Sequence, residues 1–147
     1  MQLLVLPGIE VVPMSPVASF METTPANFKW LSEAEPADGA ETFVRLSAFI
    51  DDIRIDKSRQ RCIPYTFTTT YEDAMFCRRH KRMIDPCDFF ALPNCVQPKW
   101  MFVVQPKKGD TLRRGKVMPA FNKNGGGTEV FFSRGTSDYT LVDIIRW

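Results

Sequence analysis

The amino-acid sequence predicts an α+β domain in which a mixed, mainly antiparallel β-sheet is combined with one or two short helices. From residue 42 onward, short runs of β-favouring residues recur, each bounded by Gly, Pro, Asn or Ser. Only one segment, residues 71–82, carries the start and stop signals of a helix. Strands that greatly outnumber helices indicate an α+β fold, and 147 residues are enough for one core.

Six strands are expected, at residues 43–49, 63–70, 100–104, 116–118, 129–132 and 140–145. The first alternates in the way a half-buried strand requires, which places Arg45 on the face opposite Val44 and Leu46. Residues 100–104 are almost all apolar, so we expect them to form a central strand.

The expected helix follows directly from the second strand. Thr70 can cap it, and Glu72 and Asp73 suit the positive end of the helix dipole. The helix is predicted to run to about Arg82, because the basic residues before this position suit the negative end. The Asp-Pro pair at residues 85–86 ends it.

Residues 1–40 differ in composition from the rest of the chain. They hold five of the eleven prolines, which is typical of an extended leader or linker, and the domain proper is expected over residues 41–147. Residues 1–42 carry six acids against one lysine, so with +2 overall the remaining residues have a net charge of about +7. An anionic ligand is expected in this basic part, although its charge is too scattered to indicate nucleic-acid binding by itself.

The composition argues against several classes of protein. With 44% hydrophobic and 24% charged residues, the chain has the composition of a globular protein. The four cysteines form no Cys-x-x-Cys pair and His80 is the only histidine, so we expect no metal site and interpret the cysteines mostly as free thiols. The apolar start of the chain stops at Pro7, too short for a signal peptide or a membrane span, so no membrane partner is expected.

Three features that are separated in the sequence carry the candidate chemistry. The most informative is Gly-Gly-Gly-Thr-Glu at residues 125–129, because its glycines permit positive φ values and a close approach to a ligand, and the next strand then starts with a carboxylate. The other two are Arg45 on the first strand and the threonine-rich residues 65–70. We expect all three to converge on one cleft.

This combination resembles the ADP-ribosyltransferase superfamily, whose pattern is an arginine on an early strand, an aromatic-x-Ser-Thr-Ser strand and a glutamate that begins a later strand after a mobile loop. The stretch Pro-Ala-Phe-Asn-Lys-Asn-Gly-Gly-Gly-Thr-Glu at residues 119–129 is also similar to the terminal segment of bacterial polymorphic toxin domains, including the tuberculosis necrotizing toxin group of NAD+ glycohydrolases. The resemblance covers residues 43–147 and implies an ADP-ribosyltransferase-like catalytic domain with NAD+ as its substrate.

The resemblance implies a role for each charged residue that matches the pattern. Glu129 would stabilise the positive charge that builds on the ribose as nicotinamide leaves, as carboxylates do in glycosidases, and would hold the ribose 2′-hydroxyl. Arg45 would bind the pyrophosphate or ribose through its planar fork, a task that Arg54, Arg59 or Arg61 could also take. The structural alternatives are a solvent-facing glutamate on an edge strand and a surface arginine.

The threonine strand is expected to contribute to catalysis and to NAD+ binding. Alternation places Thr66, Thr68 and Thr70 on one face. Thr68 matches the first serine of the family pattern, whose hydroxyl orients the catalytic carboxylate. The implied NAD+-binding residues are Arg45, Tyr65, Phe67, Thr68, Thr70, Tyr71, Gly126 and Gly127. Among them, an aromatic ring would stack on nicotinamide. The alternative is plain β-propensity and core packing.

Two reactions of NAD+ remain open. A mono-ADP-ribosyltransferase would move ADP-ribose to a protein or nucleic-acid acceptor, but not to arginine, because Gly127 stands where arginine-modifying enzymes carry Glu or Gln. An NAD+ glycohydrolase would use water instead, and the glycohydrolase toxins often have Gln at the position of Glu129. The resemblance to toxins implies a secreted effector that is delivered as part of a larger protein, acts in the cytoplasm of a target cell and has a cognate immunity protein. A third alternative is a non-enzymatic, β-rich binding module.

Overall fold

The computed structural model describes residues 2–4, 12–14, 32–91, 96–119 and 122–147. Its main feature is a seven-stranded sheet with the order β11-β8-β4-β7-β10-β9-β3, in which every described pairing is antiparallel. Two short helices accompany it in the described part of the chain. The predicted α+β class with a mainly antiparallel sheet is confirmed, whereas the parallel pairing implied by a mixed sheet is not seen among the described strands.

The strands of the sheet are β3 (Glu35–Pro36), β4 (Phe43–Ser47), β7 (Thr66–Thr70), β8 (Trp100–Val104), β9 (Thr111–Lys116), β10 (Thr128–Phe132) and β11 (Leu141–Arg146). Two further strand pairs are β1 (Gln2–Leu4) with β2 (Val12–Met14), and β5 (Ile55–Asp56) with β6 (Arg61–Cys62). The helices are α2 (Tyr71–Arg79) and α3 (Pro86–Phe89).

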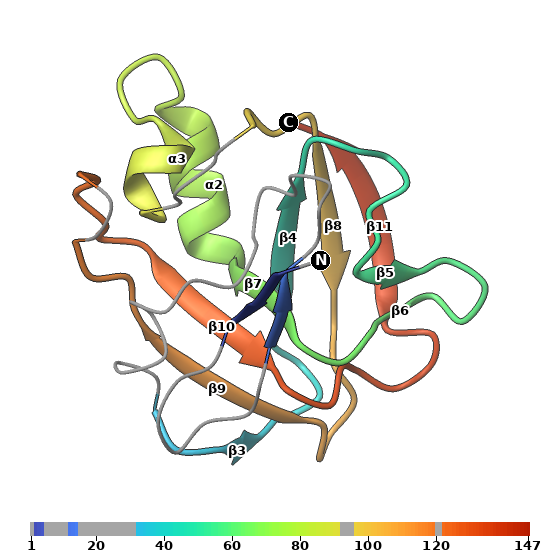
Figure 1. Cartoon of the computed structure of the whole chain (residues 1–147). Helices are drawn as coiled ribbons and strands as arrows, with labels where there is room; N and C mark the ends of the chain where they lie inside the picture. Colours follow the sequence, from blue (N-terminus) through green and yellow to red (C-terminus); the bar gives the residue numbers. More distant parts are fainter. Residues whose placement is uncertain (1, 5–11, 15–31, 92–95, 120–121) are drawn as a thin grey trace.

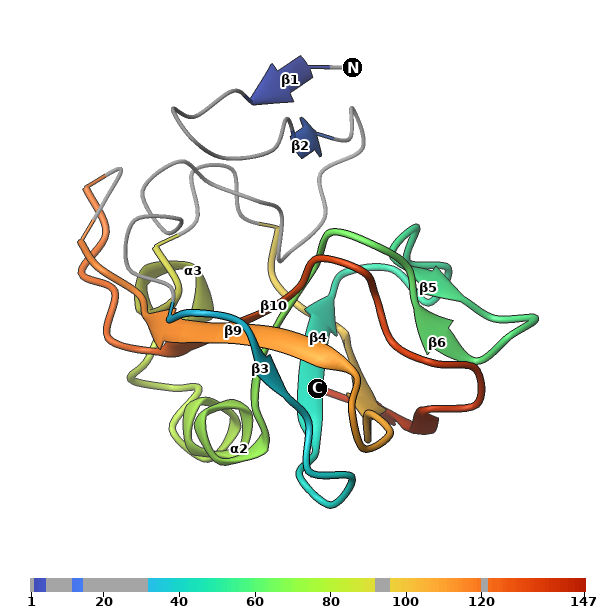
Figure 2. The same ribbon diagram turned by 90° about the horizontal axis from the view of Figure 1, so that it is seen from below.

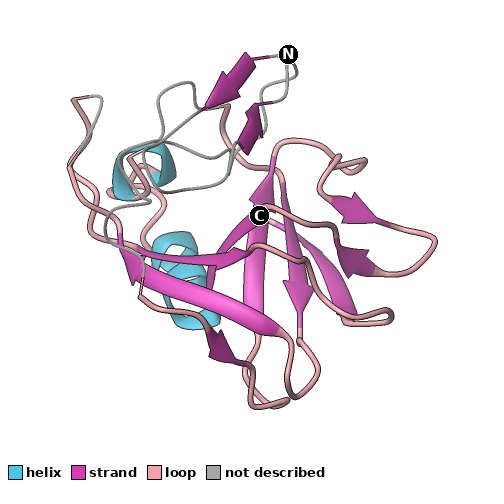
Figure 3. Ribbon diagram, turned by 60° about the horizontal axis from the view of Figure 1, so that its bottom comes forward, coloured by secondary structure: helices cyan, strands magenta, loops and turns pink. Residues whose placement is uncertain are grey.

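The sheet is strongly twisted. In Figure 1, β4, β8 and β11 run nearly vertically, whereas β9 and β10 cross the view diagonally. The view from below shows α2 on one side of β9 and β10 (Figure 2). The two helices lie near each other at one end of the molecule, and the β5–β6 hairpin lies at the other (Figure 3). Helices and hairpin therefore support different parts of the sheet.

Helix α2 begins where the sequence predicts and ends earlier. Thr70 is its N-cap, with a side chain that accepts a hydrogen bond from the Asp73 N–H at 3.2 Å. The helix ends at Arg79 rather than near Arg82, and His80 leaves the helical conformation. The residues after Arg79 are exposed and basic, so extending the helix would bury no apolar side chain, and packing is what stabilises short helices.

The strand predictions differ in quality. Strand β8 has the predicted bounds, and β10 begins one residue before the predicted start. The strand predicted at residues 116–118 is wrong, because β9 occupies Thr111–Lys116 and pairs with both β10 and β3. Strand β4 is buried at all five positions rather than half-buried, since β7 and β8 flank it and apolar clusters cover both faces. Strand β7 starts only at Thr66, because Tyr65 has a positive φ of 66° that interrupts the extended chain.

The expected leader over residues 1–40 lies largely outside the described residues. Its last part belongs to the sheet, because Glu35 of β3 pairs with Leu112 of β9 and Ala37 is buried. The sheet therefore begins before residue 41.

Two apolar clusters lie on the two faces of the sheet. The first packs the sheet against both helices and includes Val44, Phe67 and Phe131 of the strands together with Ala74 of α2 and Phe90 after α3. The second, on the opposite face, comprises Ala37, Phe43, Ile55, Cys62, Phe102, Val104, Leu112, Val130 and Phe132. The sheet thus forms the middle layer of the fold.

The cysteines differ from one another. Cys62 and Cys77 are free and buried, and burial raises the pKa of each thiol to about 12, so neither is a reactive thiolate at neutral pH. Cys87 is disulfide-bonded, so the prediction of free thiols is wrong for this residue.

Within the described residues, the longest helix, α2, has nine residues, and no helix has the length and hydropathy needed to span a bilayer.

Candidate functional site

Glu129 is the second residue of β10 and is 3% exposed. It lies in the interior of the sheet, because β10 is flanked by β7 and β9. The alternative of a solvent-facing glutamate on an edge strand is therefore wrong. Gly115 is directly opposite Glu129 on β9, so no side chain on that strand faces the carboxylate directly. A carboxylate buried in this way lies in surroundings of low dielectric, where its charge acts strongly on a neighbouring positive charge.

Three hydrogen bonds fix the backbone on either side of Glu129. The Thr69 hydroxyl donates to the carbonyl of Thr128 at 2.6 Å, and the Thr68 hydroxyl donates to the carbonyl of Val130 at 3.1 Å. From helix α2, the Asp73 carboxylate accepts the N–H of Thr128 at 2.6 Å. The start of β10 is therefore held by both β7 and α2. Thr68 acts on the strand that carries Glu129, through a backbone carbonyl.

The strand register separates Arg45 and Thr68 from Glu129. Cross-strand partners share a face, and Val130 pairs with Thr68, so Glu129, as the neighbour of Val130, points to the opposite face from Thr68. Val44 pairs with Thr69, so Arg45 lies on the same face as Thr68. The prediction that Arg45 and Glu129 converge on one cleft is therefore wrong. Below, the Glu129 face is the one with Glu129, Thr69 and the first apolar cluster, and the Arg45 face is the other.

Arg45 is fully buried and bound to protein groups. Its Nε lies 3.1 Å and 3.2 Å from the two carboxylate oxygens of Asp52, and its Nη1 donates to the carbonyl of Phe67 at 3.0 Å. Burial would raise the pKa of Asp52, but the positive charge of Arg45, the Ser47 hydroxyl and the N–H of Arg54 outweigh burial and hold this pKa below its usual value. In this structure the guanidinium of Arg45 is used to join β4 and β7 to the loop that follows β4, and its predicted contact with NAD+ would require the ion pair to open.

The other arginines weighed as substitutes lie away from Glu129. Arg54 precedes β5, Arg59 lies in the turn of the β5–β6 hairpin, and Arg61 begins β6. Figure 3 shows this hairpin at the end of the molecule opposite the helices. None of the three lies on a strand next to β10.

Arg113 is the arginine that the register brings to the Glu129 face. It pairs with Phe131 on the neighbouring strand, and Phe131 lies on the same face as Glu129. Arg113 and Glu129 are therefore diagonal neighbours, a relation in which residues lie about 7–8 Å apart, within reach of a long side chain. Arg113 is partly exposed, and its Nε donates to the carbonyl of Ser32 at 2.8 Å.

The predicted aromatic residues have different surroundings. Phe67 is 1% exposed and stacks on Phe131 with 4.4 Å between ring centroids, so it packs in the core. Tyr65 is partly exposed, and its ring lies 6.4 Å from that of Phe131. Tyr71, the first residue of α2, is 37% exposed. Tyr65 and Tyr71 therefore remain the rings that a ligand can reach, whereas Thr70 caps α2 with its hydroxyl.

The glycines before β10 pack against the segment of α3. A Cβ at Gly127 would lie 2.6 Å from the ring of Phe90, which is buried, so no larger residue fits there without a shift. Gly126 has a φ of 111° and is exposed, and a Cβ there would contact Phe89 at 3.7 Å. Gly127 is thus required for packing, and only Gly126 is open to a ligand.

Sequence reasoning missed Thr69, Asp73 and Arg113 as members of this site. The sequence indicates Asp73 only as an acid in the first turn of the helix, and Thr69 only as one of the threonine-rich residues 65–70. Their roles follow from the register of β10 against β7 and β9, and the sequence has no signal for this register.

Among the residues that the structure describes, no group of three or more His, Cys, Asp or Glu side chains is arranged to hold a metal ion. No model of a known protein family, no curated protein and no solved structure matches this chain.

Proposed function

We propose that this protein consumes NAD+ and transfers ADP-ribose to an acceptor, with Glu129 as the catalytic carboxylate. The observation that carries the proposal is the placement of Glu129, 3% exposed, on a strand that two threonine hydroxyls and the Asp73 carboxylate hold in position. A charge that is fixed before the reaction and screened little by water stabilises a developing opposite charge without reorganisation. The resemblance of residues 43–147 to ADP-ribosyltransferases supplies the chemistry that such a carboxylate would serve.

In the proposed reaction the bond between C1′ of the ribose and the nicotinamide nitrogen breaks. Nicotinamide leaves as a neutral molecule with the bonding electrons, and positive charge develops on the ribose. Glu129 stabilises this oxocarbenium-like state, and a nucleophile of the acceptor then attacks C1′ and loses its proton. Thr68, Thr69 and Asp73 act as positioning residues, because they contact the backbone beside Glu129.

Arg113 is proposed as the residue that binds the pyrophosphate of NAD+. It lies on the Glu129 face, one strand away, and a guanidinium meets phosphate oxygens through two parallel hydrogen bonds. Arg45, by contrast, is bound to Asp52, and we propose that it keeps β7 in place through its bond to the Phe67 carbonyl. Tyr65 and Tyr71 are the proposed partners of the nicotinamide ring.

One observation favours NAD+ hydrolysis as the second candidate function. Gly127 is packed against Phe90 and leaves no room for the Glu or Gln that arginine-modifying enzymes carry at this position. Water needs no side chain that recognises a protein acceptor. A glycohydrolase would use the same residues, with water in place of the acceptor.

Purified protein incubated with NAD+ labelled in its adenylate half, with and without extract of a target cell, separates these reactions. Release of nicotinamide together with label on a macromolecule supports transfer, and release without such label supports hydrolysis. Glu129→Ala should lower the rate of release roughly 10²- to 10³-fold, with Glu72→Ala, at an exposed glutamate of α2, as the matched control. If the folded wild-type protein releases no nicotinamide from NAD+, the non-enzymatic binding module is the hypothesis that is left.

The biological setting is proposed from the resemblance to toxin domains. The protein would be an effector domain that acts in the cytoplasm of a target cell, and an immunity protein would protect the producing cell. Expression inside bacteria tests this setting. The wild type should stop growth and Glu129→Ala should not. Equal growth of both strains at equal protein levels would contradict the toxin assignment.

A further inference from the structure

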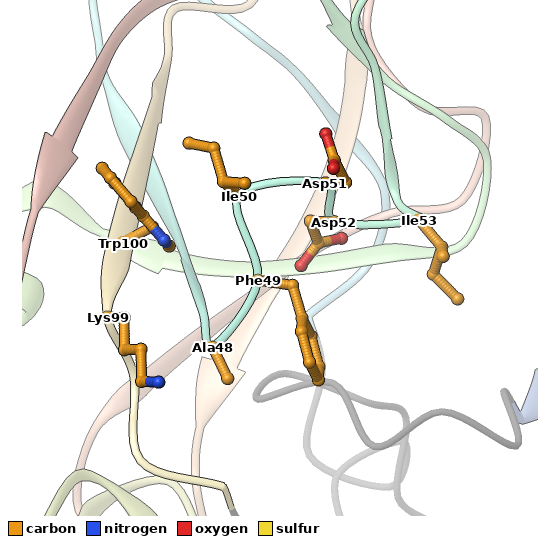
Figure 4. Close-up of a pocket in the computed structure, with 8 residues that line it drawn as sticks. All are labelled: Ala48, Phe49, Ile50, Asp51, Asp52, Ile53, Lys99 and Trp100. Carbon is orange, nitrogen blue, oxygen red and sulfur yellow. The ribbon is translucent and has the colours of Figure 1, made fainter.

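Two pockets in the described part of the molecule differ in the charges that line them. The pocket of about 390 Å³ in Figure 4 lies between the loop after β4 and the start of β8. Its carboxylates are already paired, Asp52 with Arg45 at 3.1 Å and Asp51 with Lys57 at 2.6 Å. Lys99 is the single cation among its lining residues, so an anion with several charges has only one cation to meet there.

The second pocket, of about 310 Å³, lies beyond the end of β10. It is lined by Arg61 of β6, by residues 109–111 at the start of β9 and by residues 134–137 after β10. These lining residues include two arginines, one carboxylate and no aromatic side chain. The lining therefore carries a net positive charge. The volume lies at the lower end of the range of small-molecule sites, about 300–1,000 Å³.

Arg61 has a buried donor that the described residues leave without an acceptor. Its Nε is buried and makes no hydrogen bond, and the carboxylate of Asp138, which is 51% exposed, lies 3.7 Å away, too far for one. Its Nη1 donates to the carbonyl of Thr136 over a long 3.4 Å. A buried donor without a partner costs free energy, and a bound ion is one reason for a protein to keep it. The guanidinium of Arg61 is therefore prepared for an acceptor from outside the chain.

Arg134 is the second cation of the pocket. It is exposed, and within the described part of the chain it makes no hydrogen bond or ion pair. Arg61 and Arg134 line the same pocket from two segments that are far apart in the sequence. A guanidinium offers its donors in a planar fork that matches two oxygens of one phosphate group. The pair is thus suited to an oxyanion with more than two acceptor atoms.

The carboxylates around this pocket are bound to groups of the protein. Asp110, which lines it, accepts the N–H of Ser137 at 3.0 Å and the Ser137 hydroxyl at 2.6 Å. Asp56 is opposite Arg61 in the β5–β6 hairpin, and it accepts the hydroxyl of Ser58 at 2.7 Å. The bonds to Asp110 also hold the loop after β10 against the turn before β9. The pocket is therefore formed before a ligand arrives.

Two glycines shape the backbone of the pocket. Gly135 has a φ of 70°, and a Cβ there would collide with the carbonyl of Cys62, so the loop can lie directly on β6. The Thr136 N–H then donates to the same carbonyl at 3.0 Å. Gly109 has a φ of 94°, and a Cβ there would meet no atom within 4 Å. The space beside Gly109 is thus open to a ligand.

We infer that this pocket binds a phosphate group between Arg61 and Arg134. A phosphomonoester carries about two negative charges at pH 7 and three strong acceptor oxygens, which satisfy the donors that the protein leaves open. The lining offers no aromatic ring on which a base could stack, so the ligand is a small polar phosphate and not a nucleic-acid strand. The inference goes beyond the proposed function, because the pocket includes neither Glu129 nor Arg113.

Isothermal titration calorimetry with ribose 5-phosphate and with inorganic phosphate, at low salt and without NAD+, tests the inference. The wild type should bind, and Arg134→Ala should raise Kd roughly 10- to 150-fold, the loss expected for one hydrogen bond to a charged group. Arg82→Ala, at an exposed arginine outside the pocket, is the matched control and should bind like the wild type. Lys99→Ala, in the pocket of Figure 4, should do the same.

Two further readouts place the ligand. Amide chemical shifts on addition of ribose 5-phosphate should change most at residues 109–111 and 134–137. Binding should tighten from pH 5 to pH 7, because the second phosphate proton leaves near pH 6. Tighter binding of ribose 5-phosphate than of inorganic phosphate assigns a phosphate ester to the site, and equal binding assigns free phosphate.

Thermal melts show that each variant is folded. Absence of binding by the wild type at millimolar ligand, or an Arg134→Ala variant that binds like Arg82→Ala, overturns the inference. Acetate that binds as tightly as phosphate contradicts recognition of a doubly charged group, and binding of heparin without binding of either small phosphate contradicts a small-ligand site. Glu129→Ala should bind phosphate like the wild type, so failure of the proposed NAD+ chemistry leaves this test intact.

Discussion

The two faces of the seven-stranded sheet hold their charged residues in different ways. On the Arg45 face, the guanidinium and the Asp52 carboxylate neutralise each other with both side chains fully buried. On the Glu129 face, Gly115 is the residue directly across from Glu129 on β9, and three hydrogen bonds fix the backbone on either side of Glu129. We interpret the buried Arg45–Asp52 pair as a structural device, and the proposed function assigns the chemistry to Glu129 on its fixed strand.

The comparison also explains why residues that match the family's sequence pattern do not have to lie in one site. Arg45 and Glu129 both lie on central strands and both are buried, yet alternation along the strands sends them to opposite faces. The predictions that follow test whether the Arg45 face serves stability and the Glu129 face serves chemistry. The three substitutions run from the largest expected effect on stability to the smallest, and a pH dependence follows them.

The largest loss of stability is expected from Arg45→Met. It leaves the Asp52 carboxylate buried without its cation, and breaking a buried pair in this way costs about 3–5 kcal/mol. Urea unfolding measures the free energy of unfolding. Lys108→Met, at an exposed lysine, is the control and should change it by about 0.5 kcal/mol or less. A loss below about 1 kcal/mol for Arg45→Met would show that the pair is not a structural device.

Gly127→Ala tests how tightly the Glu129 face is packed. The added Cβ would lie 2.6 Å from the ring of Phe90, so we expect the free energy of unfolding to fall by about 1–3 kcal/mol. Phe90→Leu in the same chain removes the aromatic ring atoms that the Cβ meets. The double variant should therefore lose less stability than the sum of the two single changes. Strict additivity would contradict the contact.

Thr69→Val removes a hydroxyl that holds the strand of Glu129. The carbonyl of Thr128 loses this donor, so a loss of about 1 kcal/mol in the free energy of unfolding is expected. Nicotinamide release should fall roughly 10- to 100-fold, because small misplacements of a catalytic group cost that much. Ser58→Ala, at an exposed hydroxyl in the β5–β6 turn, is the control. A stability loss with unchanged release would limit Thr69 to a structural role.

The last prediction is a pH dependence that belongs to the Arg45 face and appears only at acid pH. The pKa of Asp52 is depressed in the folded state from an ordinary value of 3.8, so its ionised form stabilises the fold above about pH 3.8. This contribution is lost as the pH falls below that value through the folded-state pKa. Melting temperatures of the wild type and Asp52→Asn between pH 2 and 6 measure it. The difference between the two proteins should shrink toward low pH, and parallel curves would contradict the assignment.

The sequence predicts features that depend on residues close together in the chain better than features that depend on pairing between distant segments. The continuous apolar run of β8 and the Thr70 cap of α2 are local signals, and both led to correct positions. Strand β9 was missed because Arg113, Arg114 and Gly115 interrupt any pattern of apolar residues, and pairing with β10 and β3 is what makes it a strand. Local pattern therefore predicted the fold class but not every strand.

The candidate site was predicted in part for the same reason. Glu129 at the start of a strand and a threonine strand beside it follow from local signals, and the structure places the two strands next to each other. The separation of Arg45 from Glu129 depends on register, since a shift of one residue would bring both to one face. Asp52 as the partner of Arg45, and Arg113 as the neighbour of Glu129, are long-range contacts with no local signal.

The central claim is that the Glu129 carboxylate drives the release of nicotinamide. Its most direct test is the rate of nicotinamide release from NAD+ by the wild type, Glu129→Ala and Glu72→Ala, each shown to be folded by its melting curve. The account predicts a roughly 10²- to 10³-fold loss for Glu129→Ala and a wild-type rate for Glu72→Ala. Nicotinamide release at the wild-type rate from folded Glu129→Ala would contradict it.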